Sequence, residues 1–177
     1  MNHRTFHLTG ATGGACTTTV ALMLAITADA DVIVGDPDEL QAVAGASSHQ
    51  LTPTLLATDT HPGPAPETTV IVDGGTLTHP RPRTDAPGLA FGVVRGPSYI
   101  AAKRLSEHPT KPDGLILVAE PGRALSIDDL AQATGTPVVA SIAVDPSIAR
   151  AIDAGLILSR IPSAVTTQFK RLTSFTA

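Results

Sequence analysis

Cysteine and aromatic residues are scarce in this sequence. Among 177 residues there is one cysteine and no tryptophan, and aromatic residues make up 3%. A single cysteine cannot form an internal disulfide or by itself make a structural zinc site, which favours a reducing compartment. Hydrophobic residues still amount to 42%, so the core has to be built from alanine, valine, leucine and isoleucine. This composition favours an α/β domain around a parallel sheet.

Long apolar runs and excess positive charge are also missing. No segment approaches about 18 uninterrupted apolar residues, and the opening MNHRTFHLTG has no apolar core of a signal peptide. We therefore expect a cytoplasmic protein with one domain over residues 1–177. The formal net charge of −4 removes the broad attraction on which non-specific nucleic-acid binding depends, so nucleic acid is not an expected partner.

Short apolar runs alternate with helical patterns along most of the chain, which is typical of βαβ units. The runs predict six strands, over residues 5–8, 31–35, 69–73, 89–95, 114–119 and 137–142. Helices are predicted over residues 15–27, 38–44, 98–107 and 163–173. Two further helices are predicted from capping signals, Ser126 with Asp129 and Asp145 with Pro146.

The expected fold is a three-layer α/β sandwich, with a mostly parallel, twisted sheet of about six or seven strands and helices on both faces. Two proline-rich segments, residues 47–67 and 79–88, interrupt the pattern and are predicted to be surface loops.

A glycine-rich turn, in the stretch LTGATGGACTTT, joins the first predicted strand to the first predicted helix. Backbone N–H groups and the positive end of a helix dipole converge at such a turn and form an anion site. Gly10, Gly13 and Gly14 supply its conformational freedom. A standard P-loop would place glycine and lysine at positions 15 and 16, where this chain has Ala15 and Cys16.

The turn resembles KGGxGKTT, the Walker A motif of the ParA/MinD family of ATPases. In this alignment the family's signature lysine falls on Ala11 and its P-loop lysine on Cys16, whereas Thr17 and Thr18 match the threonine pair. Both cations of the motif are therefore replaced. The resemblance assigns the nucleotide cradle to Gly10, Ala11, Thr12, Gly13, Gly14, Ala15, Cys16, Thr17 and Thr18.

Later segments extend the resemblance. DVIVGDPDEL is similar to the family's D-x-D-P strand end, where Asp36 matches but Val34 replaces the aspartate that assists water attack. TVIVDGG resembles the Walker B strand with Asp73 as its aspartate, and residues 113–157 follow the family's order of strands and helices. The resemblance implies bound ATP or ADP with magnesium at Thr17, Asp36 and Asp73.

Loss of both lysines removes two charge-assisted hydrogen bonds to phosphate, which together contribute about 3–6 kcal/mol. The affinity for ATP is expected to fall roughly 10²- to 10⁴-fold. The resemblance then implies a pseudo-ATPase with a degenerate Walker A motif, either nucleotide-independent or weakly binding ATP or ADP. Such a protein would act through protein partners in partition, division-site placement or pilus or secretion localisation, with TadZ/CpaE-type relatives nearest.

Three alternatives stay open. The family's homodimer sandwiches ATP, but with Ala11 replacing the signature lysine a homodimer here needs other contacts. A residual slow ATPase would require a rescuing cation, for which Lys103, Lys111 and Arg123 are candidates. TGATGG also resembles NAD(P)-binding short-chain dehydrogenases and NmrA-like proteins, with Tyr99 and Lys103 in Y-x-x-x-K spacing.

The remaining polar residues carry no recognisable pattern. Cys16 is interpreted as a small buried filler, and metal-ligand spacing is absent from His3, His7, His49, His61 and His79. Scattered solvated charge is the interpretation for Arg81, Arg83, Arg95, Lys103 and Arg104. The stripe of Val165, Phe169 and Leu172 predicts a terminal helix packed on the sheet; the alternative is membrane contact through residues 163–177.

Overall fold

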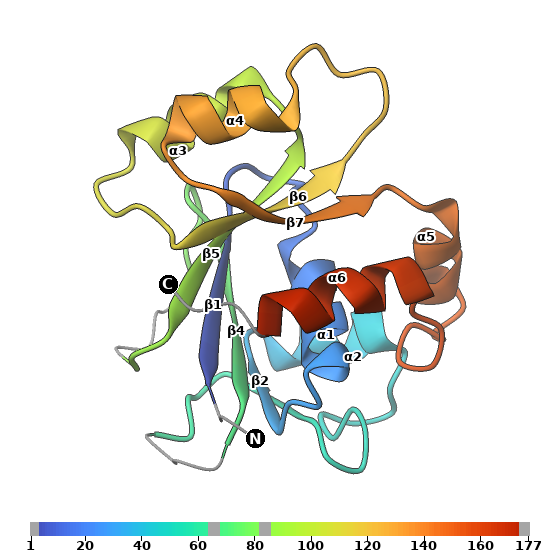
Figure 1. Ribbon diagram of the computed structural model, residues 1–177. Coiled ribbons are helices and arrows are strands. Elements are labelled where there is room, and N and C mark those ends of the chain that lie inside the picture. Colours follow the sequence, from blue (N-terminus) through green and yellow to red (C-terminus); the bar gives the residue numbers. More distant parts are fainter. Residues whose placement is uncertain (1–3, 64–67, 82–85, 174–177) are drawn as a thin grey trace.

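The computed structural model describes residues 4–63, 68–81 and 86–173. In this part of the chain, seven strands form one sheet in the order β3-β2-β4-β1-β5-β6-β7 (Figure 1). Every neighbouring pair is parallel. The strands are β1 Thr5–Gly10, β2 Val32–Val34, β3 Leu56–Thr58, β4 Val70–Thr76, β5 Leu89–Gly96, β6 Gly114–Ala119 and β7 Val138–Ala143.

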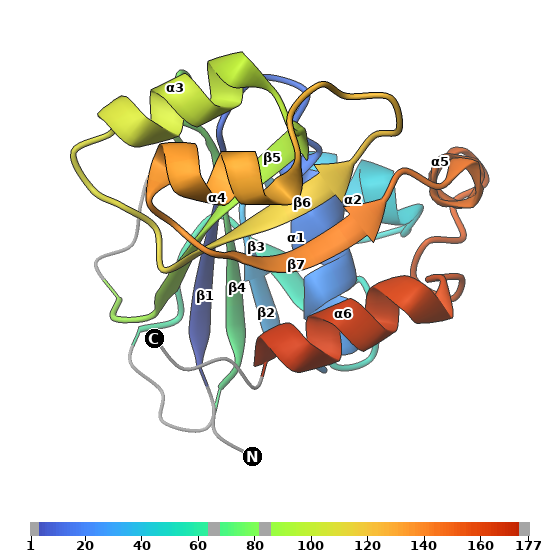
Figure 2. The same ribbon diagram turned by 45° about the horizontal axis from the view of Figure 1, so that its top comes forward.

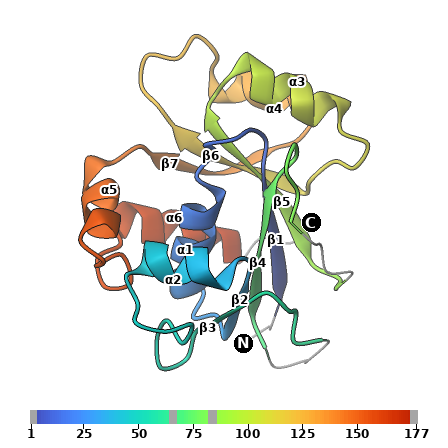
Figure 3. The ribbon, with the colours of Figure 1, turned by 180° about the vertical axis from the view of Figure 1, so that it is seen from behind.

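Helices cover both faces of the sheet, which confirms the expected three-layer α/β sandwich. They are α1 Thr17–Thr27, α2 Pro37–Ala44, α3 Tyr99–Glu107, α4 Ile127–Thr134, α5 Pro146–Asp153 and α6 Ser163–Thr173. Figure 2 shows α3 and α4 on one face of the sheet and α1 and α6 on the other. Seen from behind, α1 and α2 lie side by side, with α5 and α6 beyond them (Figure 3).

The centre of the core lies between the sheet and α1. Its sequence TTTVALMLAIT is apolar almost all round, because α1 contacts β4 on one side and both α2 and α6 on the others. Three of the four phenylalanines complete this core, and the rings of Phe6 and Phe91 stack with centroids 6.2 Å apart. Few aromatic side chains therefore suffice, since the small aliphatic residues of α1 pack closely.

Local capping signals are confirmed where they were predicted. Ser126 and Asp129 form a reciprocal capping box at α4, and the Asp145 carboxylate accepts from the amide of Ser147 at α5. The same hydrogen bonds hold the pKa of Asp129 below its ordinary value, since the Ser126 amide and hydroxyl donate to its carboxylate. These caps depend on neighbours within one helical turn, which is why the sequence alone reveals them.

The loop predicted over residues 47–67 contains a strand that was missed. β3 pairs with the edge of β2, from Val32 opposite Leu56 to Val34 opposite Thr58. The preceding turn buries Leu51 and Leu55 at 6% and 2% exposure, so the segment is not a solvent-facing loop throughout. Its three-residue strand is too short to show period-two alternation beside the prolines.

The C-terminal helix packs inside the fold, as expected from its apolar stripe. Val165, Phe169 and Leu172 are 4%, 0% and 1% exposed, and α6 contacts β7 and α1. Within the described ranges, every helix is too short or too polar to cross a bilayer. Residues outside those ranges include His3, Arg83 and positions 174–177 of the predicted membrane-contact segment.

Two glycines allow the ends of α2 and α5 to meet. Gly45 closes α2 at φ 68°, and a Cβ atom added there would lie 2.3 Å from the Cα atom of Gly155. Gly135 closes α4 at the similar φ of 66°, but an added Cβ would meet nothing within 4 Å. Comparing substitutions at Gly45 and Gly135 therefore separates the cost of a left-handed backbone from the cost of a steric clash.

We predict that Gly45→Ala lowers the free energy of unfolding by about 2–5 kcal/mol, because the left-handed penalty of about 1–2 kcal/mol adds to overpacking of about 1–3 kcal/mol. Gly135→Ala should lower the free energy of unfolding by only about 1–2 kcal/mol, because only the left-handed backbone is penalised at that position. Urea denaturation of both variants measures the difference. Equal losses of unfolding free energy in the two variants would show that the ends of α2 and α5 do not approach as described.

Candidate functional site

The glycine turn lies at the carboxyl edge of the sheet, where all parallel strands end. From β1 the chain passes through α1 to β2 on one side, whereas β4 leads across β1 to β5 on the other side. Ligands of open α/β sheets bind at such a reversal of strand order. The fold therefore places the turn of residues 11–16 where a ligand crevice is expected.

The backbone of this turn leaves several donors open. The amide of Ala11 donates to Val93 O at 2.9 Å and that of Ala15 to Thr12 O at 3.3 Å. Within the described chain, no acceptor is found for the amides of Gly13, Gly14 and Cys16. Both glycines are exposed, and Gly14 and Cys16 have φ of 72° and 66°. Open amides before a helix N-terminus form a concave site for an anion.

Cys16 does not fill the core as expected. It precedes α1 in the left-handed conformation and is only partly buried, and its thiol donates to Gly14 O at 3.6 Å. The helix consequently begins at Thr17, not at residue 15. Cys16 and Arg95 also border an apolar cleft of about 200 Å³ between α1 and α5. The open amides of the turn thus adjoin a pocket with apolar walls.

The neighbouring threonines have different environments. The Thr17 hydroxyl is buried with no hydrogen-bond partner among the described residues. It lies against Gly10, where an added Cβ would be 2.4 Å from Thr17 Oγ1, so only glycine fits at position 10. Thr18 Oγ1 instead donates to Asp73 Oδ2 at 2.7 Å, with Glu39 Oε1 a second acceptor at 3.2 Å. Thr18, not Thr17, therefore connects α1 to Asp73.

The Asp73 carboxylate is completely buried at the end of β4. It accepts from the Gly75 amide at 3.0 Å and from an Arg81 guanidinium nitrogen, Nη1, at 2.5 Å. The other terminal nitrogen of Arg81 forms an ion pair with Glu39 at the start of α2. Thr18, Glu39, Asp73 and Arg81 form one connected group, called here the Arg81 cluster.

Arg81 and Glu39 were not among the predicted site residues. The expectation that Arg81 is solvated surface charge is wrong, because its side chain is 24% exposed and bonded to two carboxylates. It follows Asp73 by eight positions within a proline-rich segment. A buried aspartate on a strand with no nearby lysine is the one sequence signal that could have indicated a need for this cation.

Each of the three residues predicted to hold magnesium has its side chain buried or bonded within the protein. Thr17 buries its hydroxyl, Asp73 is paired with Arg81, and Asp36 caps α2 by accepting from the amides of Asp38 and Glu39 at 3.1 Å each. In the described ranges, no group of three or more His, Cys, Asp or Glu side chains could hold a metal ion. In this arrangement, the residues do not fit a divalent cation.

The cations considered for a residual ATPase are engaged elsewhere. Lys103 lies 3.9 Å from Glu107, Lys111 donates to Leu105 O and Ser106 O at 3.0 and 2.9 Å, and Arg123 pairs with Glu120. Arg123, and then Arg95 at 2.5 Å, hold the pKa of the Glu120 carboxyl below its ordinary value. Tyr99, proposed with Lys103 for a dehydrogenase, is 71% exposed.

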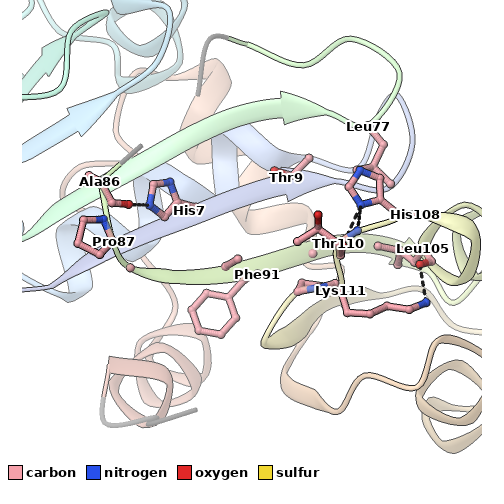
Figure 4. A pocket seen from close by; sticks show the side chains of 14 residues that line it. His7, Thr9, Leu77, Ala86, Pro87, Phe91, Leu105, His108, Thr110 and Lys111 are labelled. Carbon is pink, nitrogen blue, oxygen red and sulfur yellow. Dashed lines mark hydrogen bonds between the residues drawn. The ribbon is translucent and has the colours of Figure 1, made fainter. Parts of the chain in front are cut away.

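A second hollow, of about 290 Å³, lies on the α3 side of β1 and β5 (Figure 4). Thr9, Phe91, His108 and Lys111 are among its lining residues. His7 Nε2 makes a hydrogen bond of 3.0 Å with Ala86 O there, and the Lys111 ammonium is held by the C-terminal carbonyls of α3. The polar groups on its wall are thus used to fix the loops, and the open amides of the turn are not among its lining.

Substitution of the two threonines should have opposite effects on stability. Thr17→Val removes an unpaired buried hydroxyl, so the free energy of unfolding should stay constant or rise by up to about 1 kcal/mol. Thr18→Val removes the hydrogen bond to Asp73 and should lower it by about 1–3 kcal/mol. Urea denaturation measures both. A larger loss for Thr17→Val than for Thr18→Val would contradict the assigned contacts.

Comparison with known proteins extends to the whole fold. No family model and no curated protein matches the sequence. Among solved structures, MinD cell division protein from Aquifex aeolicus is similar with a TM-score of 0.69 at 13% identity, over 98% of this chain and 98% of that chain. A ParA family ATPase from Chlorobium tepidum has a TM-score of 0.67 at 15% identity, covering 96% of this chain and 98% of that chain.

A chain of a MinC:MinD cell division protein complex from Aquifex aeolicus is similar with a TM-score of 0.68 at 12% identity, over 98% of this chain and 97% of that chain. These likenesses extend over nearly the full length of both chains. The protein therefore has the P-loop α/β fold of the ParA and MinD ATPases.

Proposed function

We propose that this protein is a pseudo-ATPase of ParA/MinD type, which binds ATP or ADP weakly or not at all and acts by positioning a protein partner. One observation carries the proposal. The turn between β1 and α1 keeps open amides at Gly13, Gly14 and Cys16, yet Ala11 and Cys16 stand where the family's lysines would be. The backbone cradle is present without its cationic side chains.

Weak nucleotide binding is supported by the shape of the site. Backbone amides and the N-terminus of α1 attract phosphate without any lysine. The adjacent apolar cleft, bordered by Val20, Met23 and Ile142, offers a wall for a flat ring. Apolar walls with a few directed polar groups are typical of small-molecule sites. An affinity in roughly the millimolar range is the expected result of losing two charged partners.

Hydrolysis is not part of the proposal, because Ala11, Cys16 and Val34 stand at the motif positions that supply the required groups in the family. Catalysis of this reaction depends on cations at the transferred phosphoryl group and on a residue that orients the attacking water. Position 34 is a valine with 3% exposure, which cannot orient water. Lys103, Lys111 and Arg123, the candidate replacements, have other partners.

A protein partner is supported by exposed apolar side chains at the same edge of the sheet. Tyr99 and Ile100 open α3 at 71% and 59% exposure, Ile127 opens α4 at 43%, and Val144 follows β7 at 42%. All four residues lie in the segments that follow the carboxyl ends of β5, β6 and β7. One structural neighbour is a MinC:MinD complex, so a protein of this fold assembles with another protein.

The partner is proposed to belong to a partition, division-site or pilus or secretion system, with the TadZ/CpaE type as the nearest relative. A homodimer is the other assembly that the exposed edge would allow. Measuring the molar mass of the protein in solution with and without ATP distinguishes a homodimer from a complex with another protein. A nucleotide-dependent homodimer changes mass when ATP is added.

Restoring the motif tests the cradle directly. Ala15→Gly with Cys16→Lys should raise ATP affinity by roughly 10- to 100-fold, because one lysine contributes about 1.5–3 kcal/mol to a phosphate contact. Calorimetry with ATP and ADP measures the gain, and Cys16→Ala is the matched control with no added charge. An unchanged affinity in the double variant would contradict a preformed cradle.

The absence of hydrolysis has a test of its own. Phosphate release by the unaltered protein at a rate within tenfold of that of an intact family ATPase would refute the pseudo-ATPase.

A further inference from the structure

We propose that Arg81 is the resident cation of this site and excludes magnesium from it. Its guanidinium takes the place beside Asp73 that a divalent cation would occupy. Phosphate groups at the turn are then bound without a metal ion. This last step deepens the proposed function and rests on it, whereas the exclusion of the metal rests on the Arg81 cluster alone.

The backbone holds Arg81 in a fixed position. After β4 the chain turns back on itself, with paired hydrogen bonds between Thr76 and His79 at 3.2 and 3.1 Å. An isolated bridge then joins Gly75 to Pro80, and the amide of Arg81 donates to Gly74 O at 3.1 Å. Because this turn is bonded to β4 itself, the arginine is aimed at the aspartate of its own strand.

Two glycines lie close to the arginine side chain. An added Cβ at Gly35, just after β2, would lie 3.4 Å from Arg81 Nη1. An added Cβ at Gly75, which has φ of 69°, would lie 3.1 Å from Arg81 Cγ. A Cβ at Gly75 would also lie 2.7 Å from His79 O, so the turn itself requires glycine there. The low exposure of Arg81, 24%, distinguishes it from a surface arginine that contacts a carboxylate by chance.

The Arg81 cluster leaves no oxygen set for a metal ion. Magnesium requires near-octahedral oxygen ligands at about 2.0–2.1 Å. The Asp73 oxygens are bonded to Thr18, Gly75 and Arg81, and the carboxylate of Glu39 is bonded to Arg81 and Thr18. A guanidinium in a forked contact with two carboxylates also repels a second cation at the same place. Arg81 therefore blocks the site by both contact and charge.

Without the arginine, the same residues would suit a metal ion better. The carboxylates of Glu39 and Asp73 and the Thr18 hydroxyl would face one space, and the positive charge that now compensates the carboxylates would be gone. Oxygen ligands of this kind are what magnesium and manganese prefer. A neutral residue at position 81 is thus expected to create metal affinity that the natural protein does not have.

The test measures binding of Mn²⁺ alone to the full chain by electron paramagnetic resonance. Arg81→Gln keeps a hydrogen-bond donor for Asp73 but removes the charge, and Arg81→Ala removes both. Each variant should bind Mn²⁺ at least about tenfold more tightly than the unaltered protein. Arg95→Gln is the control, because it removes the same charge from an arginine that is paired with Glu120 and not with Asp73. It should bind no more Mn²⁺ than the unaltered protein.

Thermal unfolding provides a second readout, since a metal that binds the folded state raises the unfolding temperature. Millimolar MgCl₂ should raise it for Arg81→Gln and Arg81→Ala but not for the unaltered protein or Arg95→Gln, and adding Asp73→Asn to Arg81→Gln should abolish the effect. If Arg81→Ala does not fold, Arg81→Gln decides the outcome. Equal Mn²⁺ affinity in the unaltered protein and Arg81→Gln, including no binding in either, overturns the proposal. Because no nucleotide is present, a failure of ATP binding leaves this result unaffected.

Discussion

A buried negative charge, the Asp73 carboxylate, is the constraint on which the site depends. An ionised carboxylate removed from water needs a compensating charge and hydrogen bonds, or it destabilises the fold by several kcal/mol. In this protein the compensation comes from within the chain, through Arg81, Thr18 and the Gly75 amide. These contacts connect β4 to α1 and, through Glu39, to α2. The site is consequently an internal bonded network that is complete before any ligand arrives.

This network changes how the glycine turn should be understood. A phosphate cradle of backbone amides depends on the course of the chain and persists when side chains are replaced. Charge at the phosphates depends on particular side chains, and Ala11 and Cys16 supply none. In the proposed pseudo-ATPase, the component that the backbone encodes is kept and the one that side chains encode is missing. Similarity in fold to ATPases does not by itself imply catalysis.

Much of the fold could be predicted from the sequence, since its determinants are local. Apolar runs indicate the central strands, and capping pairs such as Ser126 with Asp129 mark the helix starts. β3 was missed because three residues between prolines carry no periodic signal. The turn of residues 11–16 joins β1 to α1 as predicted, whereas its binding of nucleotide stays a prediction. The contacts of Thr18 and Arg81 could not be predicted, because they join α1, α2 and the turn after β4, which only the folded chain brings together.

The position of β1 in the sheet has a consequence for how the chain folds during synthesis. Both sheet neighbours of β1 lie far downstream of it in the chain, with Thr5 opposite Val70 and Phe6 opposite Leu89. Closing such long loops is entropically unfavourable and slows folding. Until β4 has been synthesised, the segment that contains β1 therefore has no sheet neighbour to pair with. Protection of that segment by a chaperone would matter most before β5 emerges.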